Sequence, residues 1–145
     1  MFKHILVPVD GSETAQKAVR KAAGLAQAFG SAVTVIYVID PYPFTGLGSD
    51  FAYGQAEYLS AASAEAQGAL AAARQVLEPL GVPMQGEVVE AHTAWRGILD
   101  KSKAIGADLI VMGSHGRQGI EKMILGSVAQ AVLSHTHLPV LVVRD

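Results

Sequence analysis

Short apolar runs alternate with helical patterns along this chain of 145 residues, and this alternation limits its possible folds more than any other feature. Three runs are as continuously apolar as strands buried on both faces of a sheet, residues 5–9, 33–39 and 109–112, and residues 139–144 predict the last strand. A fifth run, residues 84–90, is less apolar and predicts an edge strand. Strands separated by helices join through right-handed crossovers into a parallel sheet. The pattern therefore predicts an α/β fold, a single doubly wound five-stranded parallel sheet in the order 3-2-1-4-5 with helices on both faces.

Turn and cap residues indicate where the helices begin and end. The first helix follows the turn at Asp10-Gly11-Ser12 and stops at Gly30. A second, Ala-rich helix covers about residues 55–80, and a third begins near Thr93 and ends at Gly106. Residues 40–55 are left as a loop longer than usual, which suits a lid or a partner surface. Its aromatic candidates for such a surface are Tyr42, Phe44, Phe51 and Tyr53.

Composition narrows the class of protein. Half of the residues are apolar and 17% are charged, so we expect one compact domain over residues 1–145. The net charge of −2, with both signs scattered, offers no basic surface for nucleic acid or a membrane. The lack of cysteine excludes disulfides and thiolate metal sites. With no signal peptide at the start and no apolar run of about 18 residues, the expected location is cytoplasmic.

The clearest functional pattern lies in residues 108–130. An apolar strand leads into Gly113, Gly116 and Gly126, with the spacing G-x2-G-x9-G-S. Ser127 and Gln130 fit a capping box in which Ser127 is the N-cap of a new helix. Inward-turned backbone amides and a helix N-terminus are the parts of a phosphate site. The sequence contains no Walker A motif, no Rossmann fingerprint and no nucleophile elbow, so the loop is not a P-loop, a dinucleotide-binding loop or the nucleophile turn of a hydrolase.

The predicted topology gives this loop a location. In doubly wound sheets, ligands bind beyond the carboxyl ends of the strands, at the crevice where the winding reverses. Here that crevice lies between the first and fourth strands, so Asp10 and Gly113 should face each other across it.

The chain resembles the universal stress protein family, in its ATP-binding branch, over nearly its whole length. Three segments carry the resemblance in the same order as in the family: K-H-I-L-V-P-V-D-G-S at residues 3–12, M-G-S-H-G-R with G-S-V-A at 112–117 and 126–129, and P-V-L-V-V-R at 139–144. The resemblance implies a nucleotide-binding domain that holds ATP, or another adenine nucleotide, together with Mg2+. It also implies a homodimer formed through the last strand, which starts at Pro139 and ends at Arg144.

The resemblance assigns a role to each part of the site. Adenine is expected between the first two strands, and the phosphates on the glycine loop with Arg117 close by. The implied contact residues are Pro8, Val9, Asp10, Val38, Met112, Gly113, Gly116, Arg117, Gly126, Ser127 and Val128. No catalytic residue and no protein ligand set for a metal is implied.

Several of these residues also have purely structural interpretations. Asp10 suits an Asx-turn as well as a contact to ribose, adenine or metal-bound water. Arg117 is either a phosphate clamp or a solvated loop charge, and His115 either a general base or an ordinary loop residue. His135 and His137 fit a helix C-terminus better than a metal site. Trp95 fits the apolar stripe of its helix.

The function expected from this combination is that of a cytoplasmic ATP-binding protein of stress response or signalling, with slow hydrolysis at most. The sequence contains no Walker lysine and no paired acidic cluster beside the loop. One alternative is a dimeric interaction module that has the fold but needs no nucleotide. A third is an ATPase or an adenylyl-transferring enzyme, for which catalytic groups are missing.

Overall fold

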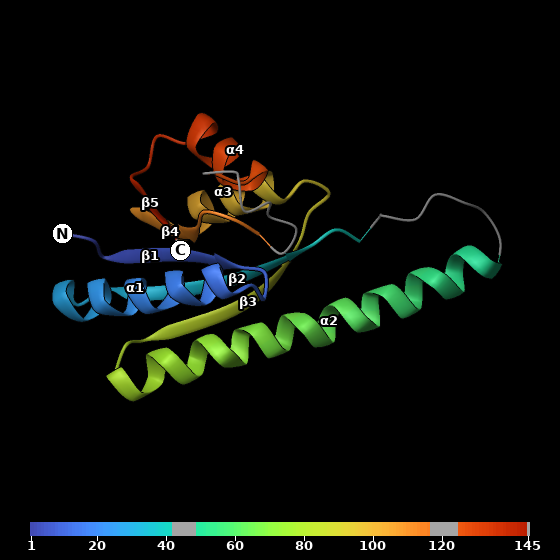
Figure 1. Ribbon diagram of the computed structural model, residues 1–145, viewed down its shortest axis with the longest axis horizontal. Coiled ribbons are helices and arrows are strands. Elements are labelled where there is room, and N and C mark those ends of the chain that lie inside the picture. Colours follow the sequence, from blue (N-terminus) through green and yellow to red (C-terminus); the bar gives the residue numbers. More distant parts are fainter. Residues whose placement is uncertain (42–48, 117–124, 145) are drawn as a thin grey trace.

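The computed structural model describes residues 1–41, 49–116 and 125–144, with residues 49–53 described as backbone only. Its five strands are all parallel and follow the order β3-β2-β1-β4-β5, as predicted (Figure 1). In chain order the elements are β1 (His4–Val9), α1 (Glu13–Phe29), β2 (Ala32–Ile39), α2 (Ser49–Leu77), the 3-10 turn η1 (Glu78–Leu80), β3 (Met84–Glu90), α3 (Ala94–Ile105), β4 (Leu109–Gly113), α4 (Ser127–His135) and β5 (Val140–Val143).

Helices cover both faces of the sheet, and each face has its own apolar core. α1 and α2 pack on one face, and α3 and α4 pack on the other (Figure 1). Alternate residues of β1 enter opposite cores: Ile5 and Val7 face α1 and α2, whereas Leu6 faces α3 and α4. All three side chains are fully buried. A strand buried on both sides must be apolar at every position, which is why these strands read as continuous apolar runs.

β1 and β4 separate toward their carboxyl ends. They pair at Ile5 with Leu109 and at Leu6 with Ile110, although β1 continues to Val9. The carbonyl oxygen of His4 accepts a hydrogen bond from the backbone N–H of Asp108, so alternate residues of β1 direct their backbone groups toward β4. Pro8 falls on that side and has no N–H to donate. The ladder therefore ends where a crevice can open.

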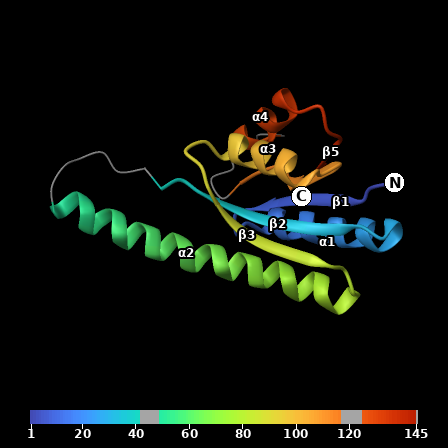
Figure 2. The same cartoon turned by 180° about the vertical axis from the view of Figure 1, so that it is seen from behind.

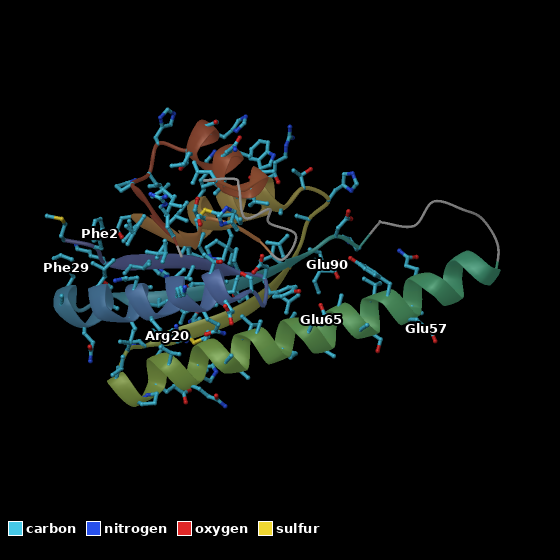
Figure 3. The ribbon with its side chains drawn as sticks, in the orientation of Figure 1. Phe2, Arg20, Phe29, Glu57, Glu65 and Glu90 are labelled. Carbon is cyan, nitrogen blue, oxygen red and sulfur yellow. The ribbon has the colours of Figure 1, made fainter. Side chains whose placement is uncertain are left out.

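The opposite end of the sheet is closed by polar and aromatic contacts. The carboxylate of Asp108 accepts the backbone N–H groups of Lys3 and His4 at 2.9 and 3.1 Å. Burial by itself raises the pKa of Asp108, but these backbone hydrogen bonds outweigh it and hold that pKa below its ordinary value of 3.8. Phe2 and Phe29 pack edge to face beside them, 5.5 Å between ring centres (Figure 3). The amino ends of the strands are thus fastened together.

The second helix is longer than the sequence predicted. α2 begins at Ser49, not near residue 55, and its N-terminal part extends beyond the carboxyl ends of the strands (Figures 1 and 2). The prediction treated Gly54 as a loop residue, but a single glycine inside a helix costs only about 1 kcal/mol. The surrounding Ala, Gln and Glu residues favour the helix enough to offset that cost. The predicted loop over residues 40–55 is therefore wrong in its second half.

The aromatic residues proposed for a lid or partner surface cannot be placed from this fold. Tyr42 and Phe44 lie outside the described residues, and the side chains of Phe51 and Tyr53 also lie outside the described part of the chain. Their role stays a prediction.

Local cap signals were correct at most helix ends. The Ser12 hydroxyl accepts the backbone N–H of Ala15 at 3.2 Å, and Gly30 ends α1 in the left-handed conformation at φ 68°. Thr93 is the N-cap of α3 as predicted, although its side chain makes no capping hydrogen bond.

The capping box predicted for the last helix is wrong. The N-cap of α4 is Gly126, and Ser127 is the first helical residue. The side-chain amide of Gln130 donates to the carbonyl oxygen of Leu125 at 3.0 Å instead of serving an N-cap amide. The physical cause is a tertiary contact: the N–H of Gly126 donates to the carbonyl oxygen of Ser114 at 2.6 Å. This bond fixes Gly126 as the N-cap, so the helix begins one residue earlier than the capping box predicted.

Two remaining expectations concern the third strand and membrane spans. β3 is an edge strand, as its weaker apolar character predicted. In the described ranges, no helix is at once long enough and apolar enough to cross a membrane.

Candidate functional site

A cavity of about 480 Å³ opens at the carboxyl ends of β1 and β4, on the side of the sheet covered by α3 and α4. This is the crevice at which the order of the strands reverses. Its volume lies within the range of about 300–1,000 Å³ that small-molecule and cofactor sites occupy. The residues that line it are Pro8, Val9, Asp10, Ala15, Val38, Ala94, Ile98, Met112, Gly113, Ser114, His115, Gly116, Gly126, Ser127, Val128 and Ala129.

The sequence prediction and this lining overlap closely. Every predicted contact residue that the structure describes lies on the cavity wall. Arg117 lies outside the described residues. The fold therefore gathers at one place segments that are a hundred residues apart in the chain.

Asp10 forms the turn between β1 and α1. Its Oδ1 atom accepts the backbone N–H of Ser12 at 3.0 Å, which confirms the Asx-turn interpretation. Gly11, at φ 84°, allows the tight left-handed step inside that turn. The other carboxylate oxygen, Oδ2, points across the crevice, 2.9 Å from where a Cβ atom on Gly116 would lie. Asp10 therefore faces Gly116 of the glycine loop, whereas the topology predicted that it would face Gly113; both glycines line the same cavity.

Gly113 is required by packing more than by backbone conformation. A Cβ atom at this position would lie 3.0 Å from both the backbone carbon and the Cβ atom of Thr14. The absence of a side chain therefore lets the first turn of α1 rest directly on the end of β4. The next residue, Ser114, follows β4 directly, and its N–H still donates to the carbonyl oxygen of Val143 in β5 at 2.8 Å.

The start of α4 supplies backbone donors to the cavity. The first amide bonded within the helix is that of Gln130, which donates to the carbonyl oxygen of Gly126 at 3.0 Å. The preceding amides, those of Ser127, Val128 and Ala129, belong to the first turn, whose N–H groups have no acceptor within a helix. Gly126 itself donates to Ser114, so it shapes the loop while the next residues present the helix N-terminus. Such an N-terminus favours anions.

His115 has an orienting partner that the sequence did not reveal. Its Nδ1 atom lies 3.1 Å from the hydroxyl oxygen of the adjacent Ser114, which is buried. His115 is one of the residues that line the cavity. Ser114 thus contacts the ring through its hydroxyl group, while its backbone N–H bonds to β5.

The two ends of the cavity differ in chemistry. One end is made of the glycine loop, Asp10 and the N-terminus of α4. The other end is apolar, with Val38 from β2 and two residues of α3, Ala94 and Ile98. Polar groups at one end and an apolar slot at the other suit a ligand that is itself divided into an anionic part and a flat apolar part.

The sequence prediction missed the contribution of α3. Ala94 and Ile98 stand four residues apart, so they share one face of their helix. That spacing was visible in the sequence. Which face of the helix meets the carboxyl end of β2 was not, because it depends on how α3 packs.

His135 and Trp95 are structural partners of each other. The ring of His135 stacks on Trp95, with 4.1 Å between ring centres, and its Nδ1 atom lies 2.8 Å from the carbonyl oxygen of Ala131. Trp95 packs at the border of the core under α3 and α4, and it is partly buried. Within the described ranges, no group of three or more His, Cys, Asp or Glu residues could hold a metal ion.

Comparison with known proteins shows which family has this sequence and fold. The model of the universal stress protein family matches residues 1–144. Universal stress protein MJ0531 of Methanocaldococcus jannaschii is 38% identical over 145 residues, which cover 99% of this chain and 83% of that protein. The structure of the universal stress protein UspA from Lactobacillus plantarum superposes with a TM-score of 0.88 at 28% identity, covering 98% of this chain and 97% of UspA.

A more distant structure shares the fold alone. It is the universal stress protein from Archaeoglobus fulgidus in complex with dAMP, with a TM-score of 0.65, 23% identity and 97% of each chain covered. The family match extends over nearly all of the sequence, and the sheet order and the crevice are as the strand–helix pattern and the topology predicted. The chain belongs to the universal stress protein family.

Proposed function

We propose that this protein is an ATP-binding member of its family that acts in stress response or signalling in the cytoplasm. In this proposal residues 1–145 form one nucleotide-binding domain. The observation that carries it is the cavity with an apolar slot at one end and a glycine loop with a helix N-terminus at the other. The dAMP bound to the Archaeoglobus fulgidus protein supports an adenine nucleotide as the ligand class.

The nucleotide would lie along the long direction of the cavity. Adenine fits the slot beside Pro8 and Val38, and ribose fits next to Asp10. The phosphates then reach the loop and the first amides of α4, among them Val128. Gly113, Gly116, Gly126 and Ser127 would also contact the phosphates, and Val9 and Met112 would complete the wall.

No single interaction in this site is strong enough by itself. A helix N-terminus contributes about 0.3–1 kcal/mol toward an anion, or ~2 kcal/mol when partly buried. Micromolar binding requires about −8 kcal/mol. Burial of the base, several backbone hydrogen bonds and a cation must therefore act together. Arg117, which belongs to the same loop in the sequence, is the proposed additional cation at the phosphates.

Mg2+ fits the groups that line the cavity. This ion keeps several waters and binds through one or two carboxylates plus the phosphates of a nucleotide. Asp10 is the one carboxylate among the described lining residues, and it stands opposite the loop. It would hold the ion directly or through water, and the ion would neutralise charge on the phosphates.

Hydrolysis should be slow. Fast phosphoryl transfer needs placed cations and a positioned nucleophile. The described wall of the cavity contains no lysine or arginine, and His115 is its one imidazole. We expect turnover below about 1 s⁻¹, the lower end of the usual enzyme range.

The direct test uses the purified full-length chain. Denaturation should release an adenine nucleotide, and calorimetric titration of the nucleotide-free protein should detect binding of ATP with Mg2+. Titrations with AMP and a cyclic dinucleotide would rank the ligands. If no nucleotide is released and millimolar ATP gives no heat, the proposal is wrong.

An antiparallel homodimer through β5 is a second part of the proposal. β5 is an edge strand of the sheet, and Leu141 in its middle is 39% exposed. An edge strand with an exposed apolar residue favours pairing with another strand. The competing function, a dimeric interaction module independent of nucleotide, would be supported if partners bind equally well to a variant that cannot bind ATP.

A further inference from the structure

The distance between α3 and the sheet sets the width of the apolar end of the cavity. A Cβ atom on Gly97 would lie 2.8 Å from the Cβ atom of Ala91 and 3.4 Å from Cγ1 of Val38. The backbone of α3 therefore rests directly on side chains that follow β3 and belong to β2. This close approach brings Ala94 and Ile98 to the cavity wall beside Val38.

Other contacts hold α3 in that position. Trp95 stacks on His135 of α4, and this contact ties the first turn of α3 to α4. Lys101 forms an ion pair with Glu87 of β3, which fixes the second half of the helix to the sheet. Ile98 is 2% exposed and packs in the core beneath. These contacts oppose a displacement of α3 away from the sheet, so a larger side chain on its cavity face takes up space in the cavity.

Ala94, unlike Trp95, Ile98 and Lys101, has no part in the contacts that hold α3 in place. It is half-buried, stands in the first turn of α3 and lines the cavity. Because Ala94 lines the cavity together with Val38 of β2, atoms added at position 94 would extend into the space between α3 and β2. The loop side of the cavity belongs to other elements, β4 and α4, and would keep its shape.

We propose that Ala94 determines which ligands the site accepts, because only a small side chain at this position leaves room for a nucleotide base. With a large residue there, the site would still bind a polyphosphate chain but not a purine nucleotide. This inference rests on the proposed function, since it assigns the base to the end of the cavity formed by α3.

The test compares two ligands in matched variants. Ala94→Leu places a branched side chain at the cavity, and Ala104→Leu makes the same change at an exposed position of the same helix. Each protein is titrated by calorimetry with ATP and Mg2+, and separately with inorganic tripolyphosphate and Mg2+. Circular dichroism and the thermal midpoint report whether the fold is retained. Ala94→Val is a milder variant for the case in which the leucine protein does not fold.

The expected result is a loss of ATP affinity of at least tenfold in Ala94→Leu, with tripolyphosphate affinity within threefold of the unmodified protein. Ala104→Leu should change neither affinity. Unchanged ATP affinity in a folded Ala94→Leu protein overturns the inference, and so does an equal loss for both ligands. If the unmodified protein binds neither ligand, the proposed function itself fails. Binding of ATP by the unmodified protein and by Ala94→Leu alike removes only the inference about Ala94.

Discussion

Gly97 gives the sharpest test of how α3 is positioned. Adding a methyl group at this residue would place two carbon atoms 2.8 Å apart, because the Cβ atom of Ala91 occupies the adjacent space. Carbon atoms in good contact are about 3.5–4.0 Å apart. Ala91 cannot move aside easily, since its backbone N–H donates to the carbonyl oxygen of Ile39 at 2.9 Å. The Gly97→Ala variant must therefore lift α3 or strain the turn before it.

The magnitude follows from two opposing effects. Overpacking a well-packed site costs about 1–3 kcal/mol. Replacing glycine by alanine inside a helix returns about 1 kcal/mol. We expect Gly97→Ala to lower the free energy of unfolding by up to about 2 kcal/mol. Gly24→Ala is the matched control, because a Cβ atom on Gly24, inside α1, meets nothing within 4 Å. That control should stabilise the protein by about 0.5–1 kcal/mol.

Urea denaturation of the four proteins in a double-mutant cycle measures these differences. The single variants Gly97→Ala and Ala91→Gly are compared with their combination, in which the colliding methyl group is absent. The combination should recover about 1 kcal/mol or more relative to the sum of the single changes. The slope of unfolding should stay constant, and each 1 kcal/mol should move the thermal midpoint by roughly 3 °C. A Gly97→Ala protein as stable as Gly24→Ala, or a combination without recovery, would refute the close contact.

Three further predictions concern the site, the sheet and the assembly. Gly116→Val should weaken ATP binding at least tenfold in calorimetry while the protein stays folded, because a Cβ atom there would lie 2.9 Å from Oδ2 of Asp10. Gly126→Val should also weaken it at least tenfold, because its Cβ atom would lie 3.2 Å from the carbonyl oxygen of Ser114. Unchanged affinity in both variants would remove the loop from the site. Asp108→Asn should lower stability at pH 7 by about 1–2 kcal/mol, since two backbone N–H groups lose a charged acceptor. The pKa of Asp108 is depressed in the folded state, so its contribution to stability is present above its ordinary value of 3.8 and is lost as the pH falls through the folded-state pKa. Urea unfolding at pH 7 and pH 3 should therefore show a smaller stability difference between the unmodified protein and Asp108→Asn at pH 3. A difference that is equal at both pH values would contradict the charged carboxylate as its cause. Leu141→Glu should convert the proposed dimer into a monomer in size-exclusion chromatography with light scattering, whereas a dimer that survives the change must use another surface.

Much of the site could be predicted because its residues stand next to strand ends. Asp10 follows the first strand, and Gly113 ends the fourth. In a parallel sheet these two ends meet at one edge once the strand order is known. The universal stress protein motifs then assigned the loop residues to the same place, and the cavity lies there.

Predictions that depended on contacts between distant segments were less reliable. The capping box at Ser127 followed a valid local rule, but the hydrogen bond from Gly126 to Ser114 set a different start for α4. Ala94 and Ile98 carried no polar signal that could mark them as wall residues. The orientation of His115 depended on the neighbouring hydroxyl group, which sequence spacing does not describe.

The sequence by itself determined the alternation of strands and helices and the helix ends at Ser12 and Gly30. These features follow from the apolar period and from backbone preferences that act within a few residues. The tertiary structure alone decided how closely α3 approaches the sheet at Gly97, how far β1 and β4 separate after Leu6, and therefore what shape the cavity has. Those distances depend on atoms brought together from remote parts of the chain, and no local pattern encodes them.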